Sequence, residues 1–150
     1  MTQFEILQII TGFLGSLAFA ILFNIRGTRL IGASIGGFLS WALFVLLGFL
    51  TENEPLRYFI VALTISVYAE IMARILKTPT TTFHMTALIP LIPGGSLYYT
   101  MASVFEGNLS NFLDKAIYTL ELAISLALGI VLVTAIARTV ARFRKVSNKS

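Results

Sequence analysis

The sequence contains no cysteine and only one histidine among its 150 residues. Without cysteine the chain has no disulfide framework, no thiolate metal site and no cysteine nucleophile. The lone His84 has no Asp or Glu at ligand spacing, so no metal site is expected. A phosphate-binding glycine loop, a serine elbow and a zinc-type histidine pair are absent as well. We therefore expect neither an enzyme nor a bound cofactor.

Charged residues are also scarce, at 12% of the chain, whereas 57% of residues are apolar and the mean hydropathy is +0.87. A soluble domain of this length carries about 25% charged residues and could not cover so much apolar surface. Lipid is the solvent that suits this composition. The net charge of +4 does not indicate nucleic-acid binding, because five of the eleven basic residues cluster near the C-terminus. These are Arg138, Arg142, Arg144, Lys145 and Lys149.

Five hydrophobic stretches are long enough to cross a bilayer, which takes about 20 apolar residues in a helix. They cover residues 4–23, 30–50, 58–76, 80–105 and 112–137. Glu5 stands where a signal peptide would be basic, so the first stretch predicts a retained helix. We expect an all-α polytopic membrane helix bundle with a five-span membrane domain over residues 1–137. A basic cytoplasmic tail over residues 138–150 would follow it.

The placement of the charges predicts the orientation of this bundle. Cytoplasmic loops of membrane proteins are enriched in Lys and Arg. Arg26 and Arg29 follow the first stretch, and Arg74 and Lys77 follow the third, so with the tail nine of eleven basic residues share one side. The other side would hold Glu5, Glu52, Glu54, Glu106 and Asp114 with only Arg57 and Lys115. We expect the N-terminus outside and the C-terminus inside, in the cytoplasmic membrane.

The fourth stretch contains Pro90, Pro93, Gly94 and Gly95 within six residues. Proline removes a backbone donor and glycine permits non-helical geometry, so this cluster predicts a helix broken near the bilayer midplane. Broken helices often build substrate sites of secondary transporters, where a half-helix N-terminus faces an anionic group. The second half-helix would start near Ser96. A structural proline kink is the alternative.

Two tyrosines, Tyr98 and Tyr99, would lie in the first turn of that second half-helix and could hydrogen-bond or wall a substrate. Two acids lie at membrane depth in the apolar stretches, Glu70 and Glu121, and Arg74 follows Glu70 at the favourable four-residue spacing. A charge at this depth is costly and often functional. These residues are candidates for coupling or gating. The alternatives are an interfacial ion pair for Glu70 and snorkelling for Glu121. His84 is a structural histidine or, less favoured, a proton relay.

Gly32, Gly36 and Gly37 place small residues at four-residue spacing in the second stretch. Such spacing lets helices approach closely and marks a helix-packing face. The partner of this face is a helix of the same chain or of another subunit. Packing within the chain is the favoured interpretation.

Three segments together resemble the threonine/serine exporter family. They are residues 19–24 (Phe-Ala-Ile-Leu-Phe-Asn), residues 69–80 with Ala-Glu-Ile-Met-Ala-Arg and Lys-Thr-Pro-Thr, and residues 89–98 with the proline-glycine block followed by tyrosine. The chain is similar to the short C-terminal half of that family, a separate subunit in bipartite systems. The resemblance implies a secondary exporter of small carboxylate metabolites, either threonine and serine or a dicarboxylate such as succinate. It also implies a second five-span subunit.

Two other functions fit the sequence, a non-transporting membrane scaffold or assembly subunit and a passive channel lined by the broken helix. The identity of the substrate also stays open at this stage. A dicarboxylate needs a second cationic site, and no Lys or Arg is expected deep in a span. Either the partner subunit supplies that cation or the substrate is zwitterionic. The stoichiometry, including any higher oligomer, is not determined by the sequence.

Overall fold

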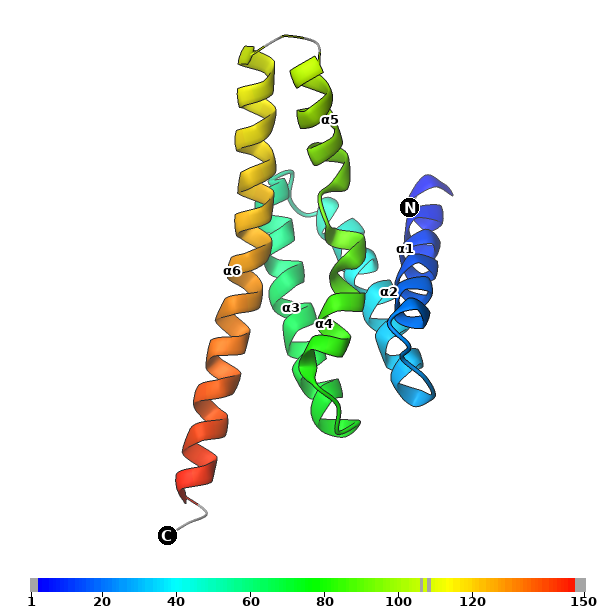
Figure 1. Cartoon of the computed structure of the whole chain (residues 1–150), viewed down its shortest axis with the longest axis vertical. Helices are drawn as coiled ribbons and strands as arrows, with labels where there is room; N and C mark the ends of the chain where they lie inside the picture. Colours follow the sequence, from blue (N-terminus) through cyan, green and yellow to red (C-terminus); the bar gives the residue numbers. More distant parts are fainter. Residues whose placement is uncertain (1–2, 106, 108, 148–150) are drawn as a thin grey trace.

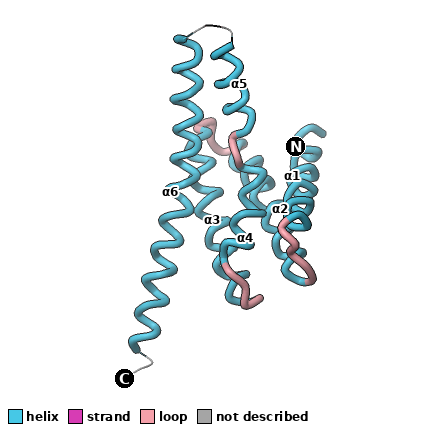
Figure 2. Tube along the Cα trace, viewed as in Figure 1, coloured by secondary structure: helices cyan, strands magenta, loops and turns pink. Residues whose placement is uncertain are grey.

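The computed structural model describes residues 3–105, 107 and 109–147. Side chains are described for these residues as far as Ala141. The described chain is helical, with no strand among these residues (Figure 1, Figure 2). Its helices are α1 (Gln3–Leu22), α2 (Thr28–Gly48), α3 (Glu54–Ile75), α4 (Thr80–Leu88), the 3-10 turn η1 (Ile89–Leu91), α5 (Gly94–Phe105) and α6 (Leu109–Ser147).

Local sequence signals account for where these helices begin and end. The Asn53 side chain caps α3 by accepting a hydrogen bond from the backbone N–H of Leu56 at 3.0 Å, with Pro55 in the first turn. The chain leaves α1 through Asn24 and α3 through Lys77, both at positive φ. Such single left-handed residues commonly end a helix. Short connections then return the chain, so successive helices are antiparallel.

Four helices, α1, α2, α3 and α6, are long and apolar enough to cross a membrane. The α4–η1 segment and α5 together form a fifth candidate span that is bent by 56° at its break. The prediction of a polytopic helical bundle with a broken fourth span is therefore confirmed. Large apolar side chains such as Leu14, Leu128 and Val131 are more than half exposed, as a lipid-facing surface requires.

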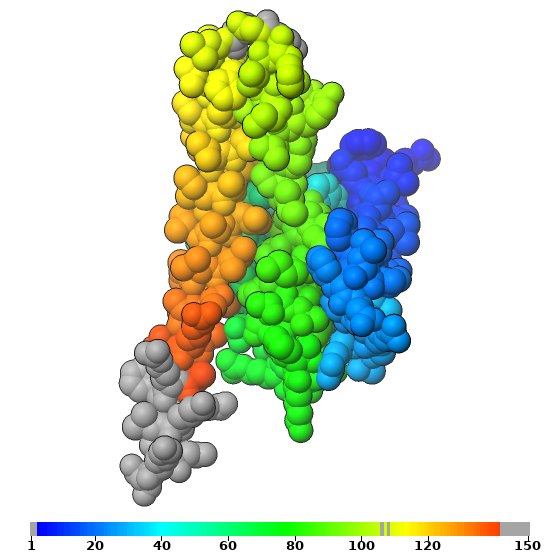
Figure 3. Space-filling view, in the orientation of Figure 1, coloured from blue at the N-terminus to red at the C-terminus, as the bar shows by residue number. Residues whose placement is uncertain are grey.

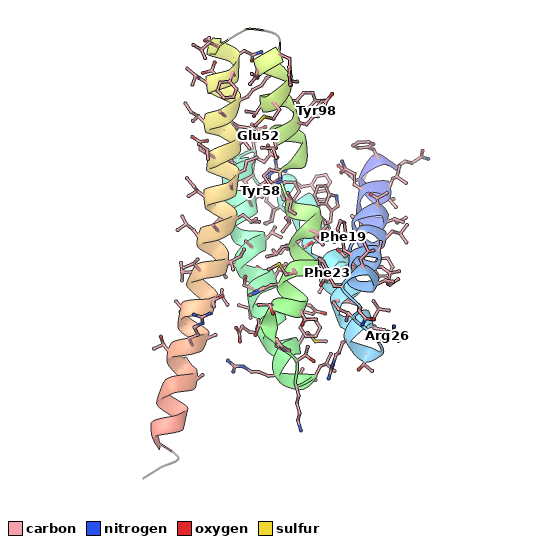
Figure 4. All side chains as sticks on the ribbon, viewed as in Figure 1. Phe19, Phe23, Arg26, Glu52, Tyr58 and Tyr98 are labelled. Carbon is pink, nitrogen blue, oxygen red and sulfur yellow. The ribbon has the colours of Figure 1, made fainter. Side chains whose placement is uncertain are left out.

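The two ends of the bundle differ in charge. The α1–α2 loop with Arg26, the α3–α4 loop and the C-terminus lie at one end, which we call the basic end (Figure 1, Figure 4). The start of α1, the α2–α3 loop with Glu52 and the end of α5 lie at the opposite, acidic end. This arrangement groups the charges as the sequence predicts, and the positive-inside rule predicts that the basic end faces the cytoplasm. Glu106 lies outside the described residues.

The last helix runs past residue 138, where the basic tail is predicted to begin. The helix α6 continues without a break to Ser147, because arginine and lysine are good helix formers once the apolar run ends. The basic stretch is therefore a helical extension of the fifth span. The side chains of Arg142, Arg144 and Lys145, and all of Lys149, lie outside the described residues.

The core joins the helices in two apolar clusters. One lies where α2, α3, η1 and α6 meet and contains Phe44, Tyr58, Ile65, Leu91 and Leu122. The other lies closer to the basic end and consists largely of alanines around Phe83. In contrast, α5 packs chiefly against α6, and this hairpin projects beyond the ends of the other helices at the acidic end (Figure 1, Figure 3).

The small residues of α2 pack inside this chain. A Cβ on Gly36 would lie 2.9 Å from the Cβ of Ala87 in α4, and Gly32 faces Phe83 in the same way. The Tyr68 hydroxyl donates a hydrogen bond of 2.7 Å to the carbonyl of Gly32. Gly37 faces α1, where a Cβ would overlap the Ser16 side chain. The glycine face thus brings α1, α3 and α4 close to α2.

Candidate functional site

The break in the fourth span is a 3-10 turn followed by two non-helical residues. After η1 ends at Leu91, Ile92 is extended (φ −60°, ψ 123°). Because the Pro93 carbonyl accepts the Leu97 N–H at 3.0 Å, α5 begins at Gly94. The sequence predicted a start near Ser96, two residues later. Glycines in the first turn explain the difference, since they enter the helix as easily as they leave it.

The break begins at membrane depth. A Cβ on Gly12, the tenth residue of the 20-residue α1, would lie 3.7 Å from the Cβ of Pro90. The first amide N–H groups of a helix have no acceptor within it, and its N-terminus carries the positive end of the dipole. The start of α5, four residues after Pro90, therefore offers donors to an anionic group on the acidic-end side of the break.

A hollow of about 290 Å³ opens beside the start of α5. It is lined by Ser96 and Tyr99 of α5 and by Lys115 and Tyr118 of α6. The Lys115 ammonium lies 5.9 Å from the centre of the Tyr99 ring, within range of a cation–π contact. A cation, two phenols and a hydroxyl belong to the residues around this hollow, while most of its exposed lining is apolar. We call this group the break site.

The register of α5 on α6 is fixed next to the break site. Thr100 and Thr119 share a buried side-chain hydrogen bond of 3.0 Å. Each hydroxyl also lies within hydrogen-bond distance of a carbonyl four residues earlier, that of Ser96 for Thr100 and that of Lys115 for Thr119. The hydroxyl that donates to the other threonine therefore gives up its carbonyl bond. Hydrogen-bonded threonines are typical contacts between membrane helices. They hold the two site residues Ser96 and Lys115 on facing turns.

Sequence reasoning identified half of the break site. Ser96 and Tyr99 were predicted, whereas Lys115 was counted as an outer charge and Tyr118 was not considered. The signal for both was the helical spacing of Lys115, Tyr118 and Thr119, which places them on adjoining positions of α6. Tyr118 also donates a hydrogen bond to the Glu54 carboxylate at the start of α3, which ties the break site to the neighbouring helix.

The other predicted binding residues surround the break without lining the hollow. Pro90 is half-buried against α1 and α2, and Pro93 closes the break. Gly94 and Gly95 face open space, with no atom within 4 Å of a Cβ built on either. Tyr98 is 69% exposed and points away from the bundle (Figure 4). The start of α5 is therefore covered on the α6 side only.

The sequence profile of the family described as "Threonine/Serine exporter, ThrE" matches residues 8–136. The chain belongs to the threonine/serine exporter family. The match covers the five spans and stops just before the basic extension of α6. No curated protein and no solved structure matches the chain.

Membership in this exporter family makes the chain a membrane transport protein and confirms the resemblance drawn from its motifs. The family is one of transporters and not of enzymes. The residues described in the structure include no group of three His, Cys, Asp or Glu side chains that could hold a metal ion. The break site is accordingly the candidate place for a solute to bind. The group of Glu70, Arg74 and His84 near the basic end is the candidate place for protons or ions to act.

Near the basic end, the structure of this exporter-family chain gathers Glu70, Arg74 and His84. Glu70 and Arg74 form an ion pair at 3.7 Å, with the Glu70 side chain 19% exposed and that of Arg74 55% exposed. His84 of α4 lies within electrostatic reach of Glu70 and beside the Ser66 backbone. Its Nε2 and the Ser66 hydroxyl are buried without a partner among the described residues. We call these four residues the basic-end cluster.

A hollow of about 370 Å³ lies beside the basic-end cluster, between α3 and α6. It is lined by Glu70 and Arg74 and by Arg138, which sequence reasoning assigned to the tail. Glu121, in contrast, is not part of this group. It is exposed on α6, while the next residue, Leu122, is fully buried in the core. The two acids singled out in the sequence are thus separated, with Glu70 half-buried beside the α3–α6 hollow and Glu121 exposed on α6.

Proposed function

We propose that the chain is one subunit of a secondary exporter in the cytoplasmic membrane that moves small carboxylate metabolites. Threonine and serine are the first candidates, because the family carries their name. The observation that carries the proposal is the break site. There the N-terminus of α5 and the Lys115 ammonium would bind the carboxylate, and Ser96, Tyr99 and Tyr118 would contact the rest of the solute.

The open side of the break site supports a second subunit. Around the break, Tyr98 and Tyr99 are 69% and 60% exposed, and α5 also exposes Leu97 and Met101. A transporter must be able to shield its site from at least one side of the membrane at a time. We infer that a second five-span subunit covers this face. Because five spans place the two ends of a chain on opposite sides, a second half of inverse orientation would supply the inverted pair that alternating access requires.

The basic-end cluster is the candidate for energy coupling. A carboxylate at membrane depth can take up and release a proton, and the unpartnered His84 Nε2 and Ser66 hydroxyl lie beside Glu70. Proton movement through this cluster would draw on the membrane potential and pH gradient, since the chain has no nucleotide site. Glu121 is the second candidate, and its exposed position fits a contact with the partner subunit.

The proposal is tested by efflux from cells loaded with a threonine-containing dipeptide. We expect a deletion strain to export threonine more slowly and the intact gene to restore the rate. The variant Lys115→Gln should lower the rate about tenfold or more at equal protein level, because a charge-assisted hydrogen bond is lost. The matched control Lys77→Gln removes the same charge at the exposed basic end and should export normally.

Other outcomes distinguish the remaining functions. Export of threonine, serine and succinate at the parental rate in the deletion strain would refute the exporter. If export needs the chain but is insensitive to Lys115→Gln, the chain acts as a scaffold for its partner. Efflux of threonine into a medium that already has a higher threonine concentration than the cell excludes a passive channel.

A further inference from the structure

A third hollow, lined by several polar side chains, lies at the acidic end, where α1, α2 and α3 meet. Its volume is about 410 Å³. The polar side chains that line it are Glu5, Gln8, Trp41, Glu54, Arg57 and Tyr58. None of these residues belongs to the break site, which is formed by α5 and α6. We call this group the acidic-end site.

Arg57 is held in a fixed position within the acidic-end site. Its guanidinium lies over the ring of Phe44, 4.9 Å from the ring centre. Gly48 makes room for it, because a Cβ at that position would stand 2.9 Å from Nη1. A planar guanidinium stacked in this way is oriented for forked binding of a carboxylate.

Two donors of the site lack acceptors. Both Nε of Arg57 and Nε1 of Trp41 are buried without a hydrogen-bond partner in the described part of the chain. Buried donors are nearly always satisfied in folded proteins, so each unpaired donor calls for an explanation. Both atoms are shielded from solvent, so carboxylate oxygens in the hollow would satisfy them once these side chains turn toward it, and the charged donor would bind most strongly.

The same hollow also contains negative charge. The Glu54 carboxylate lines it and accepts a hydrogen bond from Tyr118, and Glu5 lines it from α1. A simple anion would meet these acids as well as Arg57, and like charges in a partly buried hollow repel. A small zwitterion meets both, with its carboxylate at Arg57 and its ammonium toward Glu54.

We propose that the acidic-end site binds a small zwitterion, a molecule that carries one carboxylate and one ammonium group on neighbouring carbons. The Tyr118–Glu54 hydrogen bond connects this site with the break site, because Tyr118 lines the one and Glu54 the other. Binding itself does not depend on the exporter proposal. A role for the acidic-end site as the outer of two solute-binding sites, with the break site as the inner one, does rest on that proposed function.

Trp41 makes the binding directly measurable, because it is the single tryptophan of the chain and lines the site. The purified full chain is titrated with L-threonine while the tryptophan emission is recorded. We expect a saturable change. N-acetyl-threonine lacks the ammonium, threonine methyl ester lacks the carboxylate and succinate lacks the ammonium as well. Each should bind about tenfold more weakly or worse, as expected when one charged hydrogen bond is lost.

Two variants and a control complete the test. Arg57→Gln should weaken threonine binding about tenfold or more. If this variant does not fold, as judged by size-exclusion chromatography, Gly48→Leu serves instead, because its side chain displaces the guanidinium without removing it. Lys115→Gln should leave the emission change intact, since it alters the break site only.

Three results would overturn the acidic-end site. These are succinate or N-acetyl-threonine binding as tightly as threonine, wild-type affinity in the Arg57 variant, and loss of the emission change in Lys115→Gln. Threonine binding at Trp41 in a chain whose deletion leaves export unchanged would count against the exporter proposal alone. Normal export without any saturable emission change would count against the acidic-end site alone.

Discussion

Gly129 lets α6 approach the backbone of α3, and replacing it by alanine tests whether this contact holds the transporter bundle together. A Cβ at this position would lie 2.8 Å from the Phe59 carbonyl oxygen, 3.0 Å from the Leu63 nitrogen and 2.8 Å from the Ala62 Cβ. Two of these three atoms belong to the main chain of α3. They cannot move aside as a flexible side chain would, so the helices must separate.

The size of the effect follows from two opposing contributions. Overpacking costs about 1–3 kcal/mol, and contact with backbone favours the upper part of that range. Alanine regains about 1 kcal/mol through its better helix propensity. We therefore expect a net loss of about 1–2 kcal/mol for Gly129→Ala. In a chain of this size that lowers the melting temperature by about 2–8 °C.

The measurement is a melting curve of the purified protein in detergent at one fixed heating rate, followed by size-exclusion chromatography. Gly15→Ala is the matched control, because a Cβ on Gly15 meets no atom within 4 Å and only the propensity gain remains. It should melt at or above the parental temperature. Equal melting temperatures for Gly129→Ala and Gly15→Ala would refute the close approach of α6 to α3.

Three further predictions concern the polar contacts. Tyr118→Phe removes the hydrogen bond to Glu54 and should slow threonine efflux about tenfold at equal protein level; an unchanged rate would contradict a link between the two sites. Glu70→Gln should slow efflux and flatten its dependence on external pH, and a parental pH profile would remove Glu70 from the coupling path. Replacing Thr100 and Thr119 together by valine should cost about 0.6–1 kcal/mol in the same melting assay, and no shift would show that their bond is not needed.

The spans, their order and the break could be predicted from the sequence because their signals are local. A run of about 20 apolar residues has few other stable conformations in lipid than a helix. The prolines and glycines at 90–95 act on their own turn of helix, so the break could be placed within about two residues. The placement of Arg26 and Glu52 at opposite ends of the bundle follows because successive loops alternate between the two sides of the membrane.

The break site could be predicted only in part, because it depends on the register between α5 and α6. Ser96 and Tyr99 adjoin the break and carry a local signal. Lys115 and Tyr118 reach it only because Thr100 bonds Thr119, a pairing across 19 residues that no periodicity in one helix reveals.

The acidic-end site was likewise missed, because Arg57 looks in sequence like an ordinary charge at a helix start. Its function depends on contacts across helices. Phe44 and Gly48 of α2 position the guanidinium of an α3 residue, and Trp41 adds a donor from the same helix. Such a convergence cannot be read from spacing along one helix, since the relevant distances join different elements.

The break site and the acidic-end site lie on different helices, and the Tyr118–Glu54 hydrogen bond links them. Lys115 and Tyr99 lie on the α5–α6 hairpin, which packs against α3 through α6. Arg57 lies among α1, α2 and α3. The hydrogen bond from Tyr118 to Glu54 joins the two parts at the acidic end. Under the proposed exporter function, a solute passing from the break site to the acidic-end site would pass near this bond, so its loss is expected to affect transport more than binding at either site.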